Sequence, residues 1–247
     1  MKMDANPLSN IRFVLDHTSH PGNIGSAARA LKTMGLTRLY LVAPRRFPHA
    51  EADALACDAR DVLLNAQVSA TLDEALTGCV FAAGLTARRR DLAHPCVDVR
   101  EAAQRLVEIA TTQEVALVFG NEAYGLSNEE LARCQLMVSI PTDAAYTSLN
   151  VASAVQIMAY ELRMAVLAGS GVAPDTPELA RLEDIEFFYR RLEETLIRID
   201  FLDPNNPKRL MPRVRRMFAR AQLEKEELSI LMGMLKQINL HAKPKVD

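Results

Sequence analysis

Residues 115–131 read VALVFGNEAYGLSNEEL, and this stretch decides the fold. Its first five residues, Val115 to Phe119, are all apolar, which is typical of a strand covered on both faces of a parallel sheet. A loop with two glycines follows. Ser127 and Glu130 then have the spacing of a capping box, which predicts a short helix. A buried strand that leads through a glycine loop into a helix is the repeating unit of α/β proteins.

The same alternation continues on both sides of this stretch. Further strands are predicted at residues 11–15, 39–42, 79–84 and 136–140, and helices at 23–34, after Thr71, from Asp98 to about 111, and from Asn150 onward. We therefore expect an α/β fold whose parallel sheet carries helices on both faces. Ligands of such sheets bind beyond the carboxyl ends of the strands, so the chemistry should follow residues 15, 84, 119 and 140.

A break in composition separates this region from a tail. Residues 168–177 are rich in Gly, Ser and Pro, which is typical of a linker. Helical patterns follow at residues 178–199, 211–220 and 224–240. We expect a main domain over residues 1–168, a linker over 169–177 and a small helical C-terminal extension over 178–247. The extension is too short for a large core of its own, so it should pack on the main domain or on a second copy.

The bulk composition excludes several classes of protein. Hydrophobic residues make up 49% of the 247 residues and charged residues 24%, as in ordinary globular proteins. The net charge of −2 means that a nucleic-acid partner would have to meet a local basic face. The four cysteines are scattered without a C-x-x-C pair, which argues against a disulfide framework and a zinc site. No apolar stretch is long enough for a membrane span, and the N-terminus lacks a signal-peptide pattern. We expect a cytoplasmic protein without a metal.

The first polar segment is HTSHPGNIGSAAR, residues 17–29. It joins a strand to a helix through two glycines, and Asn23 could cap the start of that helix. Arg29 would then lie one to two turns inside the helix. A glycine turn followed by a surface arginine explains the same spacing equally well.

Two more polar segments follow strands. Between Phe119 and Ser127, two glycines flank Asn121 and Glu122, and glycines there allow a ligand to approach the backbone closely. Residues 139–150, SIPTDAAYTSLN, lead into the long apolar helix. Free N–H groups at that helix start, with the hydroxyls of Thr147 and Ser148, suit a polar small molecule. An ordinary N-cap explains this last segment as well.

Three long stretches carry a family resemblance: TSHPGNIGSAARALKTMG (18–35), VALVFGNEAYGLSNEEL (115–131) and YTSLNVASAVQIMAYELRMA (146–165). They resemble the three motifs of SPOUT-class methyltransferases, in the TrmH-type branch of RNA 2′-O-ribose methyltransferases, and are most similar to the TrmJ-type tRNA enzymes. The resemblance covers residues 10–168, and the tail also suits that group. It implies S-adenosylmethionine as cofactor, a C-terminal trefoil knot in the sheet, and a homodimer whose active site is completed across the interface.

The resemblance also implies roles for single residues. Arg29 is the main catalytic candidate, with Asn23, Glu122 and Ser148 in support. Cofactor contacts are expected at Leu85, Thr86, Ala87, Gly120, Ile140, Thr147, Ser148 and Leu149. Because the pKa of a guanidinium exceeds ~12, we expect Arg29 to orient a phosphate or the nucleophile, although a role as base stays open.

The implied substrate is the ribose 2′-hydroxyl of cytidine or uridine at position 32 of tRNA. TrmJ-type sequences often carry Arg after the glycine of the second motif, whereas this chain has Asn121, as in the wider TrmH group. Ribosomal RNA and other tRNA positions therefore stay open as substrates. A non-catalytic RNA-binding dimer is the alternative of another class, and the intact set Asn23, Arg29, Glu122 and Ser148 argues against it.

Two basic segments are candidates for RNA contact. Arg88, Arg89 and Arg90 follow the strand at 79–84, beside the expected cofactor loop, although a run of arginines is commonly just a solvated surface. In the tail, Arg213, Arg216 and Arg220 fall at helical spacing on one face. A basic amphipathic helix could also bind a membrane or a partner helix, but RNA is the better match to a methyltransferase.

Overall fold

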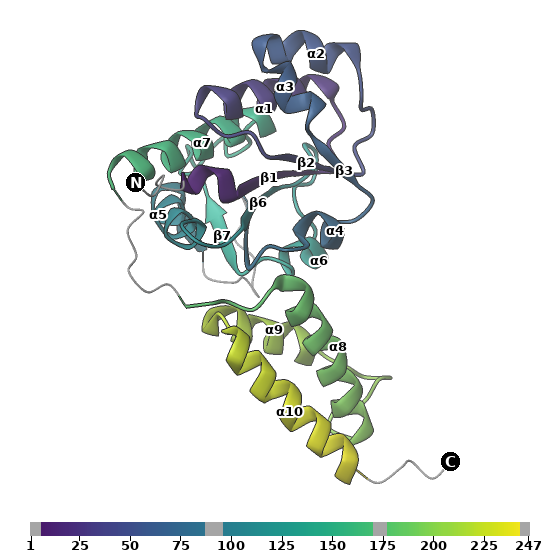
Figure 1. Ribbon diagram of the computed structural model, residues 1–247. Coiled ribbons are helices and arrows are strands. Elements are labelled where there is room, and N and C mark those ends of the chain that lie inside the picture. The colour runs from purple at the N-terminus through teal and green to yellow at the C-terminus, as the bar shows by residue number, and fades with distance from the viewer. Residues whose placement is uncertain (1–5, 87–95, 170–176, 243–247) are drawn as a thin grey trace.

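The computed structural model describes residues 6–86, 96–169 and 177–242. In this part of the chain, seven strands form one sheet in the order β3-β2-β1-β6-β4-β7-β5, and every strand pair is parallel (Figure 1). The strands are β1 (Ile11–Asp16), β2 (Leu39–Val42), β3 (Gln67–Ser69), β4 (Phe81–Leu85), β5 (Cys96–Asp98), β6 (Val115–Phe119) and β7 (Leu136–Ser139). The predicted parallel α/β sheet is confirmed.

Helices cover both faces of this sheet, and three more form a bundle at one end of the molecule (Figure 1). The helices are η1 (Pro7–Asn10), α1 (Pro21–Thr33), α2 (Ala50–Ala56), η2 (Cys57–Ala59), α3 (Arg60–Leu64), α4 (Leu72–Leu76), α5 (Val99–Ala110), α6 (Asn128–Leu131), α7 (Val151–Leu167), α8 (Leu182–Arg198), α9 (Leu210–Ala221) and α10 (Lys225–His241). None of the helices that the structure describes is long and apolar enough to cross a membrane.

Alternation along the central strands creates two hydrophobic cores. In β1, Ile11, Phe13 and Leu15 face the core that includes α1, α5 and α7, whereas Val14 faces the core of α4, α6 and α8. Phe13 stacks on Phe119 of β6, with ring centroids 5.6 Å apart. A strand that is apolar on both sides is what a doubly covered sheet requires, and this explains the unbroken apolar run in the sequence.

Helix α1 begins earlier than predicted. It starts at Pro21, whose fixed φ suits the first helical position, and its N-cap is His20. The expectation that Asn23 caps this helix is therefore wrong, because Asn23 lies inside the first turn. Its side chain is free to reach across to another segment instead.

The region between the second and third strands contains elements that the pattern did not predict. Helices α2, η2 and α3 are short, and their alanines and charged residues show no clear period. The two edge strands β3 and β5 have three residues each, which is too short for an alternation to be visible. Helix α2 packs very closely on α1, since a Cβ on Gly25 would lie 2.1 Å from the carbonyl oxygen of Ala52.

The C-terminal helices pack against the main domain near the N-terminal end of β4. The N–H of Leu182 donates to the carbonyl of Cys79 at 3.0 Å, and the N–H of Gly78 donates to the Glu183 carboxylate at 3.2 Å. Helix α8 starts four residues later than predicted, because Leu179 pairs with Glu224 in a bridge that joins it to the start of α10. The domain boundaries and the trefoil knot stay predictions, and residues 170–176 of the expected linker lie outside the described residues.

Candidate active site

A cavity of about 220 Å³ lies where β4, β6 and β7 end. One molecule of liquid water occupies only ~30 Å³, so the cavity has room for an organic ligand. Seven residues expected to contact the cofactor line it: Leu85, Thr86, Gly120, Ile140, Thr147, Ser148 and Leu149. The eighth, Ala87, lies outside the described residues. Three segments that are far apart in sequence therefore meet at one cavity, at the sheet edge where parallel α/β proteins bind ligands.

The loop after β6 forms one wall of the cavity by folding back on itself. The N–H of Gly125 donates to the carbonyl of Asn121 at 2.8 Å, and Gly125 has a left-handed φ of 71°. A Cβ on Gly120 would lie 2.3 Å from the backbone of both Gly125 and Leu126. Glycine at position 120 is thus required by the close approach of the two arms of the loop, a reason that the sequence interpretation did not include.

Asn121 fastens this loop to the turn after β1. Its Nδ2 donates to the carbonyl of His17 at 2.7 Å and to the Ser19 hydroxyl at 3.0 Å, and its Oδ1 accepts the N–H of Ala123. The side chain is buried and its hydrogen-bonding capacity is used within the protein. The departure from TrmJ-type sequences at this position therefore has a structural role in this chain.

Glu122 connects the same loop to the start of α1. One oxygen accepts the N–H of Ser19 at 2.9 Å, and the other accepts the N–H of His20 at 3.3 Å and Nδ2 of Asn23 at 2.8 Å. His20 is the N-cap of α1, so a carboxylate from a distant loop serves the helix end that has no capping side chain among the described residues.

The hydrogen bonds also decide the charge of Glu122. Burial by itself would raise the pKa of this carboxyl, but the hydrogen bonds from Ser19, Asn23 and His20 outweigh it and hold the pKa below its ordinary value. A carboxylate with a lowered pKa and occupied lone pairs is a poor proton acceptor at neutral pH. Glu122 is therefore suited to holding the two segments together.

Asn150 is a site residue that the sequence analysis did not assign. Its Oδ1 caps α7 by accepting the N–H groups of Ala152 and Ser153, and its Nδ2 donates to Oδ1 of Asn23 at 2.8 Å. A continuous chain of hydrogen bonds thus runs from Glu122 through Asn23 to Asn150. The N-cap pattern at Asn150 is visible in the sequence, but its partner lies 127 residues away.

The four catalytic candidates occupy two places. Glu122 and Ser148 line the cavity, and Asn23 is bonded to Glu122. Arg29 does not line this cavity; its side chain is exposed on α1, with Nη1 3.6 Å from Sγ of Cys57. Arg29 and Asn23 share a helix, but Arg29 lies nearly two turns further along it.

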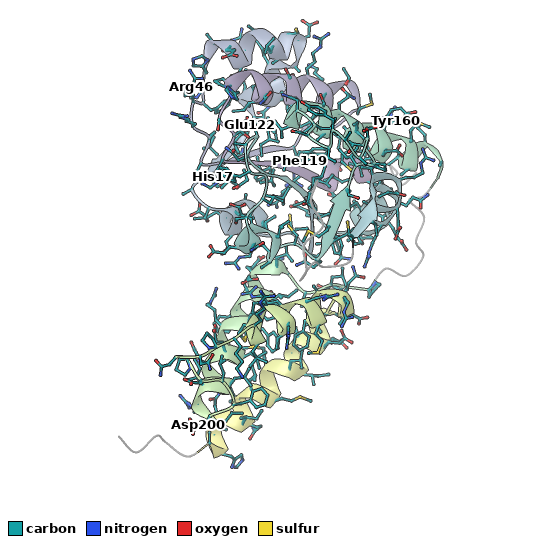
Figure 2. The ribbon with its side chains drawn as sticks, turned by 180° about the vertical axis from the view of Figure 1, so that it is seen from behind. His17, Arg46, Phe119, Glu122, Tyr160 and Asp200 are labelled. Carbon is teal, nitrogen blue, oxygen red and sulfur yellow. The ribbon has the colours of Figure 1, made fainter. Side chains whose placement is uncertain are left out.

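Another titratable group lies behind the turn after β1. Asp16 ends β1 and is fully buried, and Nδ1 of His17 lies 2.9 Å from its Oδ2. Burial raises the pKa of Asp16 to about 6; the contact with His17 lowers it and the Glu130 carboxylate raises it. Figure 2 shows His17 and Glu122 on the same side of the main domain, with Phe119 nearer its middle.

Comparison with known proteins identifies the family of the chain. Residues 10–160 match the model of the SpoU rRNA Methylase family, and residues 183–246 match that of the C-terminal domain of the tRNA methyltransferase TrmJ. Over 239 residues, 92% of this chain and 93% of the relative, the chain is 48% identical to the tRNA (cytidine/uridine/adenosine-2′-O-)-methyltransferase TrmJ of Pseudomonas aeruginosa. The chain belongs to the TrmJ family.

Solved structures of related proteins agree with this assignment. The crystal structure of TrmJ from Z. mobilis is 29% identical, has a TM-score of 0.81, and matches over 92% of this chain and 98% of that one. The SpoU methyltransferase AviRb from Streptomyces viridochromogenes, solved with its cofactor AdoMet, is 25% identical with a TM-score of 0.52, over 68% of this chain and 66% of that one.

The cavity suits the cofactor that a TrmJ-family protein needs. S-adenosylmethionine has a flat adenine ring, a ribose, and a charged methionine part, so its site needs apolar walls as well as hydrogen-bonding groups. The cavity supplies apolar side chains from Leu85, Leu126 and Val138, and hydroxyl groups from Thr142, Thr147 and Ser148. The residues present therefore fit S-adenosylmethionine.

Of the two basic segments expected to contact RNA, the structure describes only the one in the tail. Arg88, Arg89 and Arg90 lie outside the described residues. In α9, Arg213 and Arg220 are exposed and Arg216 is half-buried. The intervening Arg215 points inward, where it forms a two-pronged ion pair with Glu186 at 2.5 and 2.8 Å and covers the ring of Tyr189.

Proposed function

We propose that this TrmJ-family protein transfers the methyl group of S-adenosylmethionine to a ribose 2′-hydroxyl of tRNA, at cytidine or uridine 32. One observation carries the proposal: the second and third motif segments line one cavity, and the hydrogen bonds of Asn23 to Glu122 and Asn150 join the first motif segment to both. Relatives about half identical to the chain over nearly its full length are tRNA 2′-O-methyltransferases by name. Since tRNA is the substrate, we place the enzyme in the cytoplasm.

The chain positions the reactants. When bound, the cofactor supplies an electrophilic methyl group on a sulfonium, which is activated for transfer without a metal. The loop of Thr147, Ser148 and Leu149 and the wall at Gly120 hold the cofactor's polar and apolar parts. The hydrogen bonds of Glu122, Asn23 and Asn150 fix the loop after β6 and the start of α7 relative to each other, so that the methyl group and the hydroxyl can be aligned. Arg29 orients the 2′-hydroxyl or the neighbouring phosphate, as its permanent charge suits.

We assign Arg29 to the cavity of a second copy of the chain. Its side chain is exposed on α1, away from the cavity of its own chain. Helix α7, which packs against α1, exposes Tyr160, Met164 and Leu167, and a groove beside α1 has both apolar and polar residues in its lining, Ser26 and Gln156 among them. Apolar side chains exposed along one helix suit an interface. A homodimer through α1 and α7 would bury them and bring Arg29 toward the partner's site.

We assign RNA contact to two basic segments. Arg213, Arg216 and Arg220 lie on α9, and Arg88 to Arg90 follow Thr86 of the cavity wall in the sequence. These arginines would contact the phosphate backbone, which positions RNA without selecting its sequence. A net charge of −2 is compatible with RNA binding by these two segments, because the positive charge need only be local.

Mapping of ribose methylation tests the function. Nucleoside mass spectrometry and position mapping are applied to tRNA and ribosomal RNA from cells with and without the gene. We expect 2′-O-methylcytidine and 2′-O-methyluridine at position 32 of tRNA to disappear without the gene and to return when it is restored. Loss of a ribose methyl from ribosomal RNA or from another tRNA position would identify that site, and not position 32 of tRNA, as the substrate. Unchanged methylation of all RNA would favour a non-catalytic binding protein.

A further inference from the structure

We propose that Asp16, His17 and Glu130 form a binding site for a divalent transition-metal ion of the zinc or manganese class. The site joins the turn after β1 to helix α6, behind the wall of the cofactor cavity. It goes beyond methyl transfer, which needs no metal, and its role is to stabilise the fold around the cavity.

The geometry brings three ligand atoms together. Each of the three residues offers one nitrogen or oxygen, and these atoms all lie within 4.8 Å of one another. Asp16 is the last residue of β1, His17 follows it directly, and Glu130 comes from α6, more than a hundred residues later. An ion bound here would cross-link two segments that flank the loop after β6, which lines the cavity.

One oxygen of the buried Asp16 carboxylate lacks a hydrogen-bond partner among the residues that the structure describes. The residue is 1% exposed; Oδ2 contacts His17, but Oδ1 has no hydrogen-bond donor in the described part of the chain. Buried polar atoms in native proteins nearly always have a partner, so such an atom points to a missing water or ion. The neighbouring group is Glu130, another carboxylate, which cannot donate when ionised.

Within the described part of the chain, His17 is the basic group that faces the two carboxylates of the cluster. Asp16 and Glu130 together carry two negative charges beside one imidazole. The basic residue just after α6, Arg133, is already paired with Asp73 at 2.6 Å and with Glu186 at 3.5 Å. A divalent cation would neutralise both carboxylates at once, which a single protonated imidazole cannot do.

The donor set indicates which ions fit. Magnesium and calcium prefer sites made entirely of oxygen, whereas zinc and manganese accept imidazole together with carboxylates. The absence of a thiol from the cluster does not exclude zinc, because catalytic and structural zinc sites also use histidine and carboxylate ligands. The His17 side chain is 47% exposed, so an ion can enter from solvent and keep water ligands.

The site is held in place before any ion binds. His17 has a left-handed φ of 50°, its N–H donates to the carbonyl of Val42, and its carbonyl accepts Nδ2 of Asn121. Glu130 is fixed by the capping box, in which its Oε2 accepts the N–H of Ser127 at 2.6 Å. Because Asn121 lines the cofactor cavity, an ion that stiffens His17 would also stiffen the cavity wall.

Metal titration of the whole chain tests the proposal. Chelator-treated protein is titrated with Mn²⁺ while free Mn²⁺ is measured by electron paramagnetic resonance, since exposed thiols such as Cys57 and Cys96 bind Mn²⁺ poorly. We expect one ion per chain, and thermal unfolding at a higher temperature with Zn²⁺ or Mn²⁺ than with an equal concentration of Mg²⁺.

Three variants and one control locate the ion. Asp16→Asn, His17→Gln and Glu130→Gln should each weaken Mn²⁺ binding at least tenfold and abolish the shift in unfolding temperature. Glu129→Gln, an exposed carboxylate one position away, should bind as the wild type does. His17→Gln changes a half-exposed side chain, so it remains informative if substitution of the buried Asp16 impairs folding, which circular dichroism would reveal.

Two results would overturn the proposal. One is the failure of the wild type to bind Mn²⁺ or Zn²⁺ stoichiometrically, which would mean that the two carboxyl groups share a proton instead. The other is undiminished binding by the His17 and Glu130 variants. Methyl transfer is not measured, so neither result bears on the proposed function.

Discussion

Single residues in the site act mainly by holding segments together. Glu122 accepts hydrogen bonds from Ser19, His20 and Asn23, and Asn150 continues the chain to the start of α7. The sequence singled out Glu122 and Asn23 through their position in family motifs. Their partners could not be predicted, because hydrogen bonds between residues a hundred positions apart depend on how the strands are ordered in the sheet.

Glu122→Gln should destabilise the protein in a pH-dependent way. Its pKa is lowered in the folded state, so its contribution to stability is present above the unfolded value of ~4.3 and is lost as the pH falls through the lower folded value. Loss of a charge-assisted hydrogen bond should cost ~2 kcal/mol at neutral pH, with the difference from wild type shrinking below pH ~4. Urea unfolding between pH 3 and 7 measures this, with Glu129→Gln as control. A difference that does not change with pH would contradict the assignment.

Elements that form the sheet core were largely predictable, and short ones were not. The apolar runs at residues 11–15, 39–42 and 115–119 correspond closely to β1, β2 and β6. The capping box of Ser127 and Glu130 and the N-cap at Asn150 are confirmed by their hydrogen bonds. Helices α2 and α3 and strands β3 and β5 escaped prediction because each is held by packing on its neighbours, which leaves little periodicity in so few residues.

Gly120→Ala tests the loop after β6. The added Cβ would lie 2.3 Å from the backbone of Gly125 and Leu126, so the loop must open and the cavity wall must move. We expect the affinity for S-adenosylmethionine to fall at least tenfold in calorimetric titration. The matched control is Gly233→Ala in α10, where a Cβ meets nothing within 4 Å and helix propensity improves by up to about 1 kcal/mol. Wild-type cofactor affinity in Gly120→Ala would refute this role for the loop.

Helix α9 provides a test of RNA binding. Replacing Arg213 and Arg220 with Gln should weaken tRNA binding and reduce the slope of log affinity against log salt by about 1 for each phosphate that the variant no longer binds. Both side chains are exposed, so folding should be unaffected. Lys236→Gln on α10 is the control for removal of one exposed charge. Equal salt dependence in the arginine variant and the wild type would exclude α9 from the RNA interface.

At the scale of the whole molecule, the number of chains that form one active site depends on the position of Arg29. A single chain assembles the cavity that we propose for the cofactor but leaves Arg29 exposed on another surface. The homodimer was inferred from family resemblance alone, since an interface between copies leaves no periodic pattern in a sequence. The exposed apolar residues of α7 now support it, because they lie on a helix that packs beside α1.

Mixed dimers test whether Arg29 acts on the partner's site. Arg29→Ala keeps its own cavity, and Gly120→Ala keeps its Arg29, so each variant alone should be nearly inactive at a cofactor concentration that fills only the unaltered cavity. Unfolded and refolded together in equal amounts, half of the dimers are mixed and each has one complete site, so about a quarter of wild-type activity should return. Size-exclusion chromatography verifies that dimers form. If Arg29 acted within its own chain, the mixture would stay inactive.

The most direct measurement follows the methyl group itself. Purified protein is incubated with unmodified tRNA and S-adenosylmethionine carrying a deuterated methyl, and the digested nucleosides are analysed by mass spectrometry. If distant segments of this chain build one site for ribose methylation, the label will appear on the 2′-oxygen of cytidine or uridine and will be lost with Arg29→Ala. Label on a base, or no label in tRNA while the cofactor is bound, would contradict the account.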